Sequence, residues 1–233
     1  MAHRPAPADS RTRLLVAAAA EFAARGYEGA NVDRIARAAR LNKAMIYYHF
    51  KSKAALYTEI FREFIHAVLD DIRAVADSDR APADKIRAFV TAIATAALAR
   101  PHFPPMWLRE VAGGARRVDR ATLDLIGQVP AILGRIVAEG QAAGVFQARH
   151  PLLVHFGIVG PLVLYHVSRP IRAHLLRAGA AGASSLDPAD VLDHIVQSTL
   201  AALAPDPSPR RAASSARRAI DPQSGPPAQG RRS

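Results

Sequence analysis

Apolar residues recur every three or four positions along most of the chain. Residues 12–25 place Leu15, Ala18, Ala19 and Phe22 on one face, and residues 32–39 repeat the pattern. This is the period of an α-helix, and no stretch of any length shows the alternation of a half-buried strand. Alanine is common and runs of β-branched residues are few, which also favours helix. The pattern therefore predicts an all-α fold, with about nine helices.

Capping residues and glycines mark the expected ends of the first helices. Gly26 ends the first helix, and Asn31 caps the second. Asn42 caps a short third helix that ends near residue 50, and Ser52 caps a fourth. Only about three residues separate the second helix from the third. Two short helices joined by so tight a turn must cross steeply, which is the helix-turn-helix arrangement.

Longer helices are expected in the rest of the chain, over residues 83–99, 119–143, 151–177 and 187–204. Three prolines at positions 101, 104 and 105 predict a break after the first of these helices. The longest apolar run, residues 152–167, contains two histidines and a proline and is short for a bilayer span. We therefore expect a buried helix there and no membrane association.

Positive charge is concentrated at the two ends of the chain, whose net charge is +11. Residues 1–53 hold ten Lys/Arg and four Asp/Glu, residues 54–204 hold fifteen and fourteen, and residues 205–233 hold six and two. A basic end favours a polyanionic partner such as nucleic acid, although solubility alone would require no partner. Residues 1–9 and 205–233 are polar and rich in proline, which predicts a disordered arm and a disordered basic tail.

Several classes of chemistry are not supported by the residues. The chain has no cysteine, which excludes disulfides, thiolate zinc sites and cysteine nucleophiles. Its histidines are not spaced as pairs of metal ligands, and there is no nucleophile elbow or phosphate-binding glycine loop. The N-terminus lacks the apolar segment of a signal peptide. We therefore expect no enzyme activity, no metal and no cofactor, and we expect the protein in the cytoplasm.

Residues 41–53, with the sequence LNKAMIYYHFKSK, separate into two faces when they are placed on a helix. Ile46 and Phe50 fall on one side, where they can reach the core. The other side holds Lys43, Ala44, Tyr47 and Tyr48. Two tyrosines are unusual on a solvated face, whereas phenolic hydroxyls can bond phosphates and rings can contact sugars and thymine methyls. The alternative is that both tyrosines pack against a neighbouring helix.

Residues 30–57, with the sequence ANVDRIARAARLNKAMIYYHFKSKAALY, resemble the helix-turn-helix signature of the TetR/AcrR family of transcriptional regulators. The resemblance covers about residues 10–66. The first-helix pattern matches at Leu14, Ala18, Phe22, Gly26 and Tyr27. The later pattern matches at Ile35, Ala36, Lys43, Tyr47, His49, Phe50, Lys53 and Leu56. One departure is Arg40, which stands where the family usually has a turn glycine, so a positive φ is expected at a non-glycine residue.

The resemblance implies a role for most of the matched positions. Tyr47 and Lys53 would contact phosphates, and Lys51 also lies where a phosphate can be bound. Asn42, Lys43, Ala44 and Tyr48 would lie nearest to base edges or backbone, whereas a packing or helix-ending role is favoured for His49. The candidate DNA-binding residues are Asn31, Arg40, Asn42, Lys43, Ala44, Tyr47, Tyr48, His49, Lys51 and Lys53.

The resemblance also implies a division of the chain. Residues 10–66 would form the DNA-binding domain, with the helix-turn-helix motif at about 31–50. Residues 67–204 would bind an effector and dimerise through the last two helices. Two recognition helices about 34–36 Å apart would then bind a palindrome of double-stranded DNA. The candidate effector-binding residues are Phe103, Met106, Trp107, Phe156, Tyr165 and His166.

The predicted function is that of a dimeric repressor released from its operator by a small, largely apolar effector. Two alternatives remain open at this point. One is a helical small-molecule-binding protein or enzyme that keeps the helix-turn-helix as a scaffold. The other is a non-specific nucleic-acid packing protein that acts through its arginine-containing tail.

Overall fold

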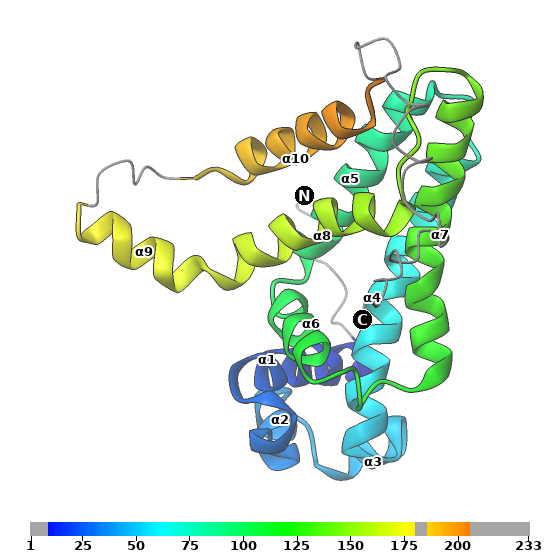
Figure 1. Cartoon of the computed structure of the whole chain (residues 1–233). Coiled ribbons are helices and arrows are strands. Elements are labelled where there is room, and N and C mark those ends of the chain that lie inside the picture. Colours follow the sequence, from blue (N-terminus) through cyan, green and yellow to red (C-terminus); the bar gives the residue numbers. More distant parts are fainter. Residues whose placement is uncertain (1–8, 180–185, 206–233) are drawn as a thin grey trace, which may run out of the picture.

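The computed structural model describes residues 9–179 and 186–205. Within these ranges the chain is all-helical, with ten α-helices and no strand (Figure 1), which confirms the predicted fold class. The predicted disordered arm and tail lie almost entirely outside the described residues. The helices are α1 (Ser10–Gly29), α2 (Val32–Ala38), α3 (Ala44–Phe50), α4 (Lys53–Ala76), α5 (Pro82–Ala99), α6 (Phe103–Ala112), α7 (Arg120–Ala142), α8 (Pro151–Val167), α9 (Arg169–Arg177) and α10 (Pro188–Leu203).

The predicted caps hold the N-terminal helices in place. The Asn31 side chain accepts a hydrogen bond from the Asp33 amide at 2.7 Å, and Ser52 accepts one from the Ala55 amide at 3.0 Å. These bonds satisfy amide groups that the first turn of a helix leaves without an internal partner. Gly26 has a φ of 68° inside α1, so the expected break occurs there and the chain then makes one further turn.

Two segments differ from the expectation. The prolines after α5 do not leave the chain irregular, because Pro104 and Pro105 lie in the first turn of α6, where proline is tolerated. The single helix expected over residues 151–177 is two helices, α8 and α9, which meet at Ser168 with a bend of 57°. These two differences bring the helix count to ten in the described part of the chain.

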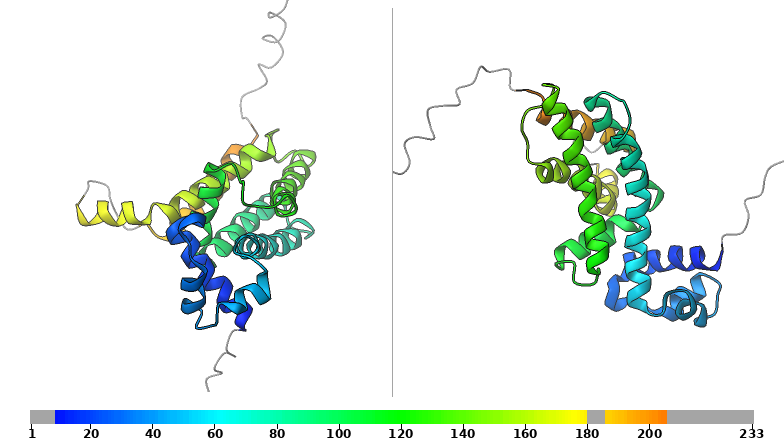
Figure 2. Two further views of the ribbon diagram at one scale, coloured as in Figure 1. Left: turned by 90° about the horizontal axis from the view of Figure 1, so that it is seen from below. Right: turned by 90° about the vertical axis from the view of Figure 1, so that its right-hand side faces the viewer.

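Helix α4 connects the two ends of the molecule. Near its first turns it packs against α1 and α3, and along its length it packs against α5 and α7 (Figure 1). Helices α8 and α10 pack against each other and against α5. Helix α9 extends away from the body in Figure 1 and in the left view of Figure 2, and none of its residues is buried. The fold therefore places α1–α3 at one end of α4 and leaves α9 projecting near the other.

Length and composition alone would allow α7 to cross a membrane, and α8 with α9 would pass together as a bent pair. In this fold α7 packs against α4, and Leu133, Ile136 and Val137 of α7 are buried in the core. A core helix has the same apolar composition as a membrane span, so these residues are explained by the packing. Helix α8 is less enclosed than expected, because only Val154, Ile158 and Leu162 are buried.

Candidate nucleic-acid interface and apolar cavity

The two sides of α3 are as different in the structure as the helical projection indicates. Ile46 and Phe50 are buried in the core, whereas Lys43, just before the helix, and Ala44 are exposed. Tyr47 is 45% exposed and Tyr48 is 72% exposed. The tyrosines therefore do not pack against a neighbouring helix in the described part of the chain. They form an outward face with Lys43 and Ala44, which we call the α3 face.

The turn between α2 and α3 is held by hydrogen bonds between side chains and the backbone. Arg40 has a φ of 55°, as its place at a turn-glycine position predicted. The Arg13 guanidinium on α1 donates to the carbonyl oxygens of Ala39 and Arg40. The Asn42 side chain accepts from the Ala44 amide at 2.9 Å and so begins α3. These contacts fix the angle at which α3 projects from α2.

The lysines near the α3 face have different surroundings. Lys43 Nζ lies 3.1 Å from the Asp33 carboxylate, and this bond raises the pKa of Lys43. Lys53 Nζ lies 4.6 Å from the centroid of the Tyr27 ring, which positions the ammonium by a cation–π contact. Lys51 is exposed in the turn between α3 and α4 and has a φ of 67°. All three side chains are at least partly accessible to an anion.

Two of the predicted DNA-binding residues have contacts within the protein. His49 Nε2 lies 2.8 Å from the Ser10 hydroxyl and so joins α3 to the start of α1. Asn31 is used as the cap of α2. These contacts agree with a structural role for both side chains.

Arg37 was not among the predicted residues. It lies on α2 and is exposed, and its guanidinium has no hydrogen bond or ion pair within residues 9–179 and 186–205. It lies in the last turn of α2, three residues before Arg40. The available signal was the repeated arginine at positions 34, 37 and 40.

Helix α6 connects the DNA-binding end to the rest of the fold through buried polar contacts. The Tyr57 hydroxyl of α4 donates to Glu110 Oε1 of α6 at 2.8 Å, and Glu110 is 3% exposed. Burial, followed by the bond to Glu110, raises the pKa of Tyr57, so its hydroxyl stays protonated and can donate. Arg109 of α6 donates to the Phe22 carbonyl of α1 at 3.4 Å. Helix α6 is therefore bonded to both α1 and α4.

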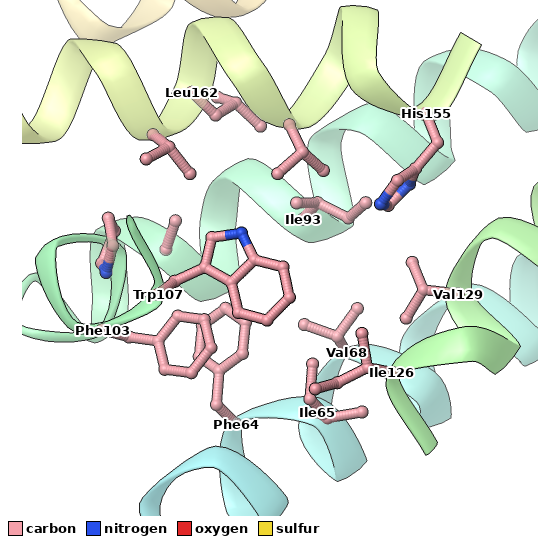
Figure 3. A pocket seen from close by; sticks show the side chains of 14 residues that line it. Phe64, Ile65, Val68, Ile93, Phe103, Trp107, Ile126, Val129, His155 and Leu162 are labelled. Atoms are coloured by element: carbon pink, nitrogen blue, oxygen red, sulfur yellow. The ribbon is translucent and has the colours of Figure 1, made fainter. Parts of the chain in front are cut away.

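The other half of α6 lines an apolar cavity of about 70 Å³ that is partly open to the surface (Figure 3). Phe103 and Trp107 of α6 face Phe64 of α4 and residues of α5, α7 and α8 across it. Phe103 and Phe64 stack with ring centroids 3.6 Å apart. The lining is apolar except for Trp107 Nε1 and the imidazole of His155, a residue that was not among the predicted effector-binding residues.

The predicted effector-binding residues separate into different places. Phe103 and Trp107 line this cavity. Met106 is buried in the core beside it but does not line it. Tyr165 and His166 line a separate hollow between α5, α8 and α10. Phe156 is 62% exposed on the outer side of α8.

The outer side of α8 is a second exposed surface. Leu153, Phe156 and Leu164 are exposed at helical spacing, with the exposed Gly157 and Gly160 between them. A Cβ added at either glycine would meet no atom within 4 Å, so the middle of this surface is open. Helix α8 contains no Lys, Arg, Asp or Glu. We call these five residues the α8 face.

A family model described as bacterial regulatory proteins of the tetR family matches residues 14–60, which include α2, α3 and the start of α4. This match covers the residues that build the α3 face. Residues 14–60 therefore belong to a DNA-binding domain of the TetR family. The similar proteins that carry functional names are transcriptional regulators and not enzymes, as expected from the sequence.

The curated relatives resemble this chain mainly at the DNA-binding end. The transcriptional activator FasR of Mycolicibacterium smegmatis is 33% identical over 84 residues, 36% of this chain and 38% of the relative. The transcriptional repressor SCO4008 of Streptomyces coelicolor is 43% identical over 54 residues, 23% and 28% of the two chains. The chain thus spans less than two fifths of either relative. The repressor NicS of Pseudomonas putida is 30% identical over 141 residues, 59% of this chain and 66% of the relative.

Solved structures extend the similarity of the fold to the rest of the described chain. A regulatory protein of the tetR family from Rhodococcus RHA1 superposes with a TM-score of 0.68 at 22% identity, covering 86% of this chain and 100% of that one. The TetR-family regulator PfmR from Thermus thermophilus gives a TM-score of 0.62 at 24% identity, covering 81% and 97%. At this identity the similarity concerns the fold, so α5–α10 also have the arrangement of the TetR family.

Proposed function

We propose that this protein is a dimeric transcriptional repressor that binds a palindromic operator in the cytoplasm and is released by a small, largely apolar effector. The observation that supports DNA binding most strongly is the α3 face. Two exposed phenols lie on a short helix that Lys43 precedes directly, and the opposite side of this helix, Ile46 and Phe50, is fixed in the core. Hydroxyl and ammonium groups held in this way suit phosphates and base edges.

In this proposal the α3 face and the basic residues next to it make different contacts. Tyr47 and Lys53 bind phosphates, and Lys51, Arg40 and Arg37 add positive charge beside them. Ala44, Tyr48 and Lys43 lie nearest to the base edges, where the small Ala44 side chain permits a close approach. Lys43 must exchange its ion pair with Asp33 for a contact to DNA.

The α8 face supports dimerisation. An uncharged surface with an exposed phenylalanine and two exposed leucines is costly to leave in water, and its burial against a second copy removes that cost. The glycines between them permit close approach of the partner helix. A two-fold dimer would present two α3 faces, which a palindrome requires.

Helix α6 supports a response to an effector. Its first turns line the cavity, and its last turns bond α1 and α4 through Arg109 and Glu110. A ligand that favours a different position of α6 would therefore also change the position of α1 and α4. Such a ligand shifts the equilibrium away from the DNA-binding arrangement by its difference in affinity for the two states.

The proposal is tested by gel-shift titration of the full-length protein with DNA flanking its own coding region. We expect Tyr47→Ala with Lys53→Ala to weaken binding by roughly 100-fold or more, because each change removes two phosphate contacts per dimer. The dependence of log affinity on log salt should become shallower by about two. Arg87→Ala, which removes one exposed charge from α5, is the matched control and should change neither quantity. Undiminished binding by the double variant would rule out the α3 face as the DNA contact.

A further inference from the structure

The chemical character of the cavity restricts the ligand that it can hold. Its walls are formed by aliphatic and aromatic side chains from α4, α5, α6, α7 and α8 (Figure 3). Within the described residues, no Lys, Arg, Asp or Glu side chain lines it. A charged ligand group would lose its hydration there without gaining an opposite charge. The apolar lining therefore favours a ligand that is uncharged.

His155 is the polar side chain that lacks a partner at this site. Its Nδ1 atom is buried and has no hydrogen-bond partner among the residues that the structure describes. Buried polar atoms in folded proteins almost always have a partner, so an atom without one calls for a group that the protein does not supply. In Figure 3 the imidazole nitrogens point from α8 toward the cavity.

The other buried atoms without a partner have different surroundings. His166 Nε2 also has no hydrogen-bond partner among the described residues. However, His166 Nδ1 lies 2.8 Å from the Leu162 carbonyl oxygen, and the ring lines a separate hollow. The Thr122 hydroxyl lines none of the cavities described above. Among the described residues, His155 alone combines a buried nitrogen without a partner with a place on the wall of the apolar cavity.

We infer that the cavity binds an uncharged, predominantly apolar molecule with one hydroxyl or carbonyl group, and that His155 bonds this group. The inference rests on the proposed effector response and specifies the chemical class of the effector. A neutral imidazole has one donor and one acceptor nitrogen, so it can pair with either group. Burial lowers the pKa of His155, which agrees with an imidazole that is uncharged near neutral pH. Trp107 Nε1 supplies one further donor to the same space and is neutral as well.

The fluorescence of Trp107 can be used to measure ligand binding in the cavity. Trp107 is the only tryptophan of the chain and it lines the cavity, so its fluorescence reports on molecules that enter. We propose titrating the full-length protein, near pH 8 and without DNA, with 1-hexanol and with hexanoate, which have the same chain length and differ in the charge of the head group. Calorimetry gives the same dissociation constants independently of fluorescence. We expect 1-hexanol to bind roughly tenfold or more tightly than hexanoate, because only the carboxylate loses the hydration of a charged group without gaining an opposite charge.

Variants of His155 test the proposed hydrogen bond. His155→Phe keeps a ring but removes both nitrogens, and we expect it to weaken 1-hexanol binding by roughly 3- to 10-fold. His155→Asn returns a donor and an acceptor near the position of Nδ1 and should restore most of the affinity. His66→Phe makes the same replacement at an exposed position of α4, away from the cavity, and should leave 1-hexanol binding unchanged. Circular-dichroism melting checks that each variant is folded.

Three results would overturn the inference. These are hexanoate binding as tightly as 1-hexanol, 1-hexanol binding that His155→Phe leaves unchanged, and no binding of either probe by calorimetry. Binding to DNA is measured separately on the wild-type protein. A protein that binds 1-hexanol through His155 but does not bind DNA would contradict the proposed function and leave the ligand class standing.

Discussion

The α3 face and the α8 face both expose large side chains, yet they differ in chemistry. The α3 face combines two phenols with a lysine. The α8 face has a phenylalanine, two leucines and two glycines on a helix without any charged residue of the Lys, Arg, Asp or Glu type. A surface that binds a polyanion must offer cations and hydroxyls, whereas a surface that binds its own copy gains most from apolar area. The exposed area of a face does not indicate whether the face binds DNA or a second copy of the chain, whereas the polar groups on the face do.

The two faces also depend on each other in DNA binding. If the α8 face forms the dimer, each α3 face contributes half of the DNA contacts, and the affinity for a palindrome depends on both. Helix α6 lies between the two regions and bonds to α1 and α4. We therefore expect the largest change in free energy from a substitution at the α8 face. A substitution at the α6 contacts should have a smaller effect, and one at the α2–α3 turn the smallest.

The largest effect is expected from Phe156→Arg on the α8 face. In a two-fold interface the substitution occurs twice, and it replaces an exposed aromatic ring by a charge that the partner surface cannot pair. We expect the protein to become monomeric at micromolar concentration, as measured by light scattering coupled to size-exclusion chromatography. Its affinity for a palindromic site should fall by roughly 100-fold or more.

Leu123→Arg is the matched control for this prediction, because it also places an arginine at an exposed apolar position but lies on α7. It should leave both the molecular mass and the DNA affinity unchanged. A Phe156→Arg protein that stays dimeric would show that the copies meet elsewhere.

A smaller effect is expected from Tyr57→Phe at the α4–α6 contact. The substitution removes the hydroxyl that donates to Glu110 and leaves that carboxylate oxygen buried without this partner. We expect the free energy of unfolding, measured by urea titration, to fall by about 1–3 kcal/mol. Tyr48→Phe removes an exposed hydroxyl of the α3 face and should change stability by less than about 0.5 kcal/mol. Equal stability of the two variants would mean that the Tyr57–Glu110 bond does not hold α4 to α6.

The smallest effect is expected at the turn between α2 and α3. Arg40 has a φ of 55°, which costs a residue with a side chain about 1–2 kcal/mol relative to the right-handed conformation, whereas glycine adopts it freely. After allowance for the greater freedom of glycine in the unfolded chain, Arg40→Gly should raise the free energy of unfolding by about 0.5–1 kcal/mol. Arg37→Gly, in the helical conformation of α2, should lower it by about 1 kcal/mol. A loss of stability in Arg40→Gly would show that this φ is not the source of strain.

The DNA-binding end was predictable from the sequence because local signals agree there. The side chains of Asn31 and Ser52 cap α2 and α4, as is typical of these residue types. Ile46 and Phe50 fall on one side of α3, and Arg40 occupies a turn position with a positive φ. Each of these properties depends on a few neighbouring residues. The positive φ of Lys51 was missed, because a lysine gives no sign of it.

The α8 region was less predictable because its helix is apolar on nearly every side. With no polar side to orient it, the sequence could not indicate that Phe156 faces outward while His155 faces the cavity. The bend at Ser168 was missed although Pro170 lies inside the helix expected over residues 151–177, where it cannot donate to the carbonyl oxygen four residues earlier. Positions in the cavity depend on contacts between helices far apart in the sequence, which periodicity alone does not determine.

The most direct test of the account is selection of binding sites from a pool of random double-stranded DNA by the full-length protein. The account predicts enrichment of inverted repeats whose half-site centres are about 10 base pairs, or an integral number of helical turns, apart. The same selection with the Tyr47→Ala and Lys53→Ala protein should enrich no motif. Enrichment of the same inverted repeat by this variant would contradict the central claim that the α3 face binds the operator, and so would the absence of any motif with the wild-type protein.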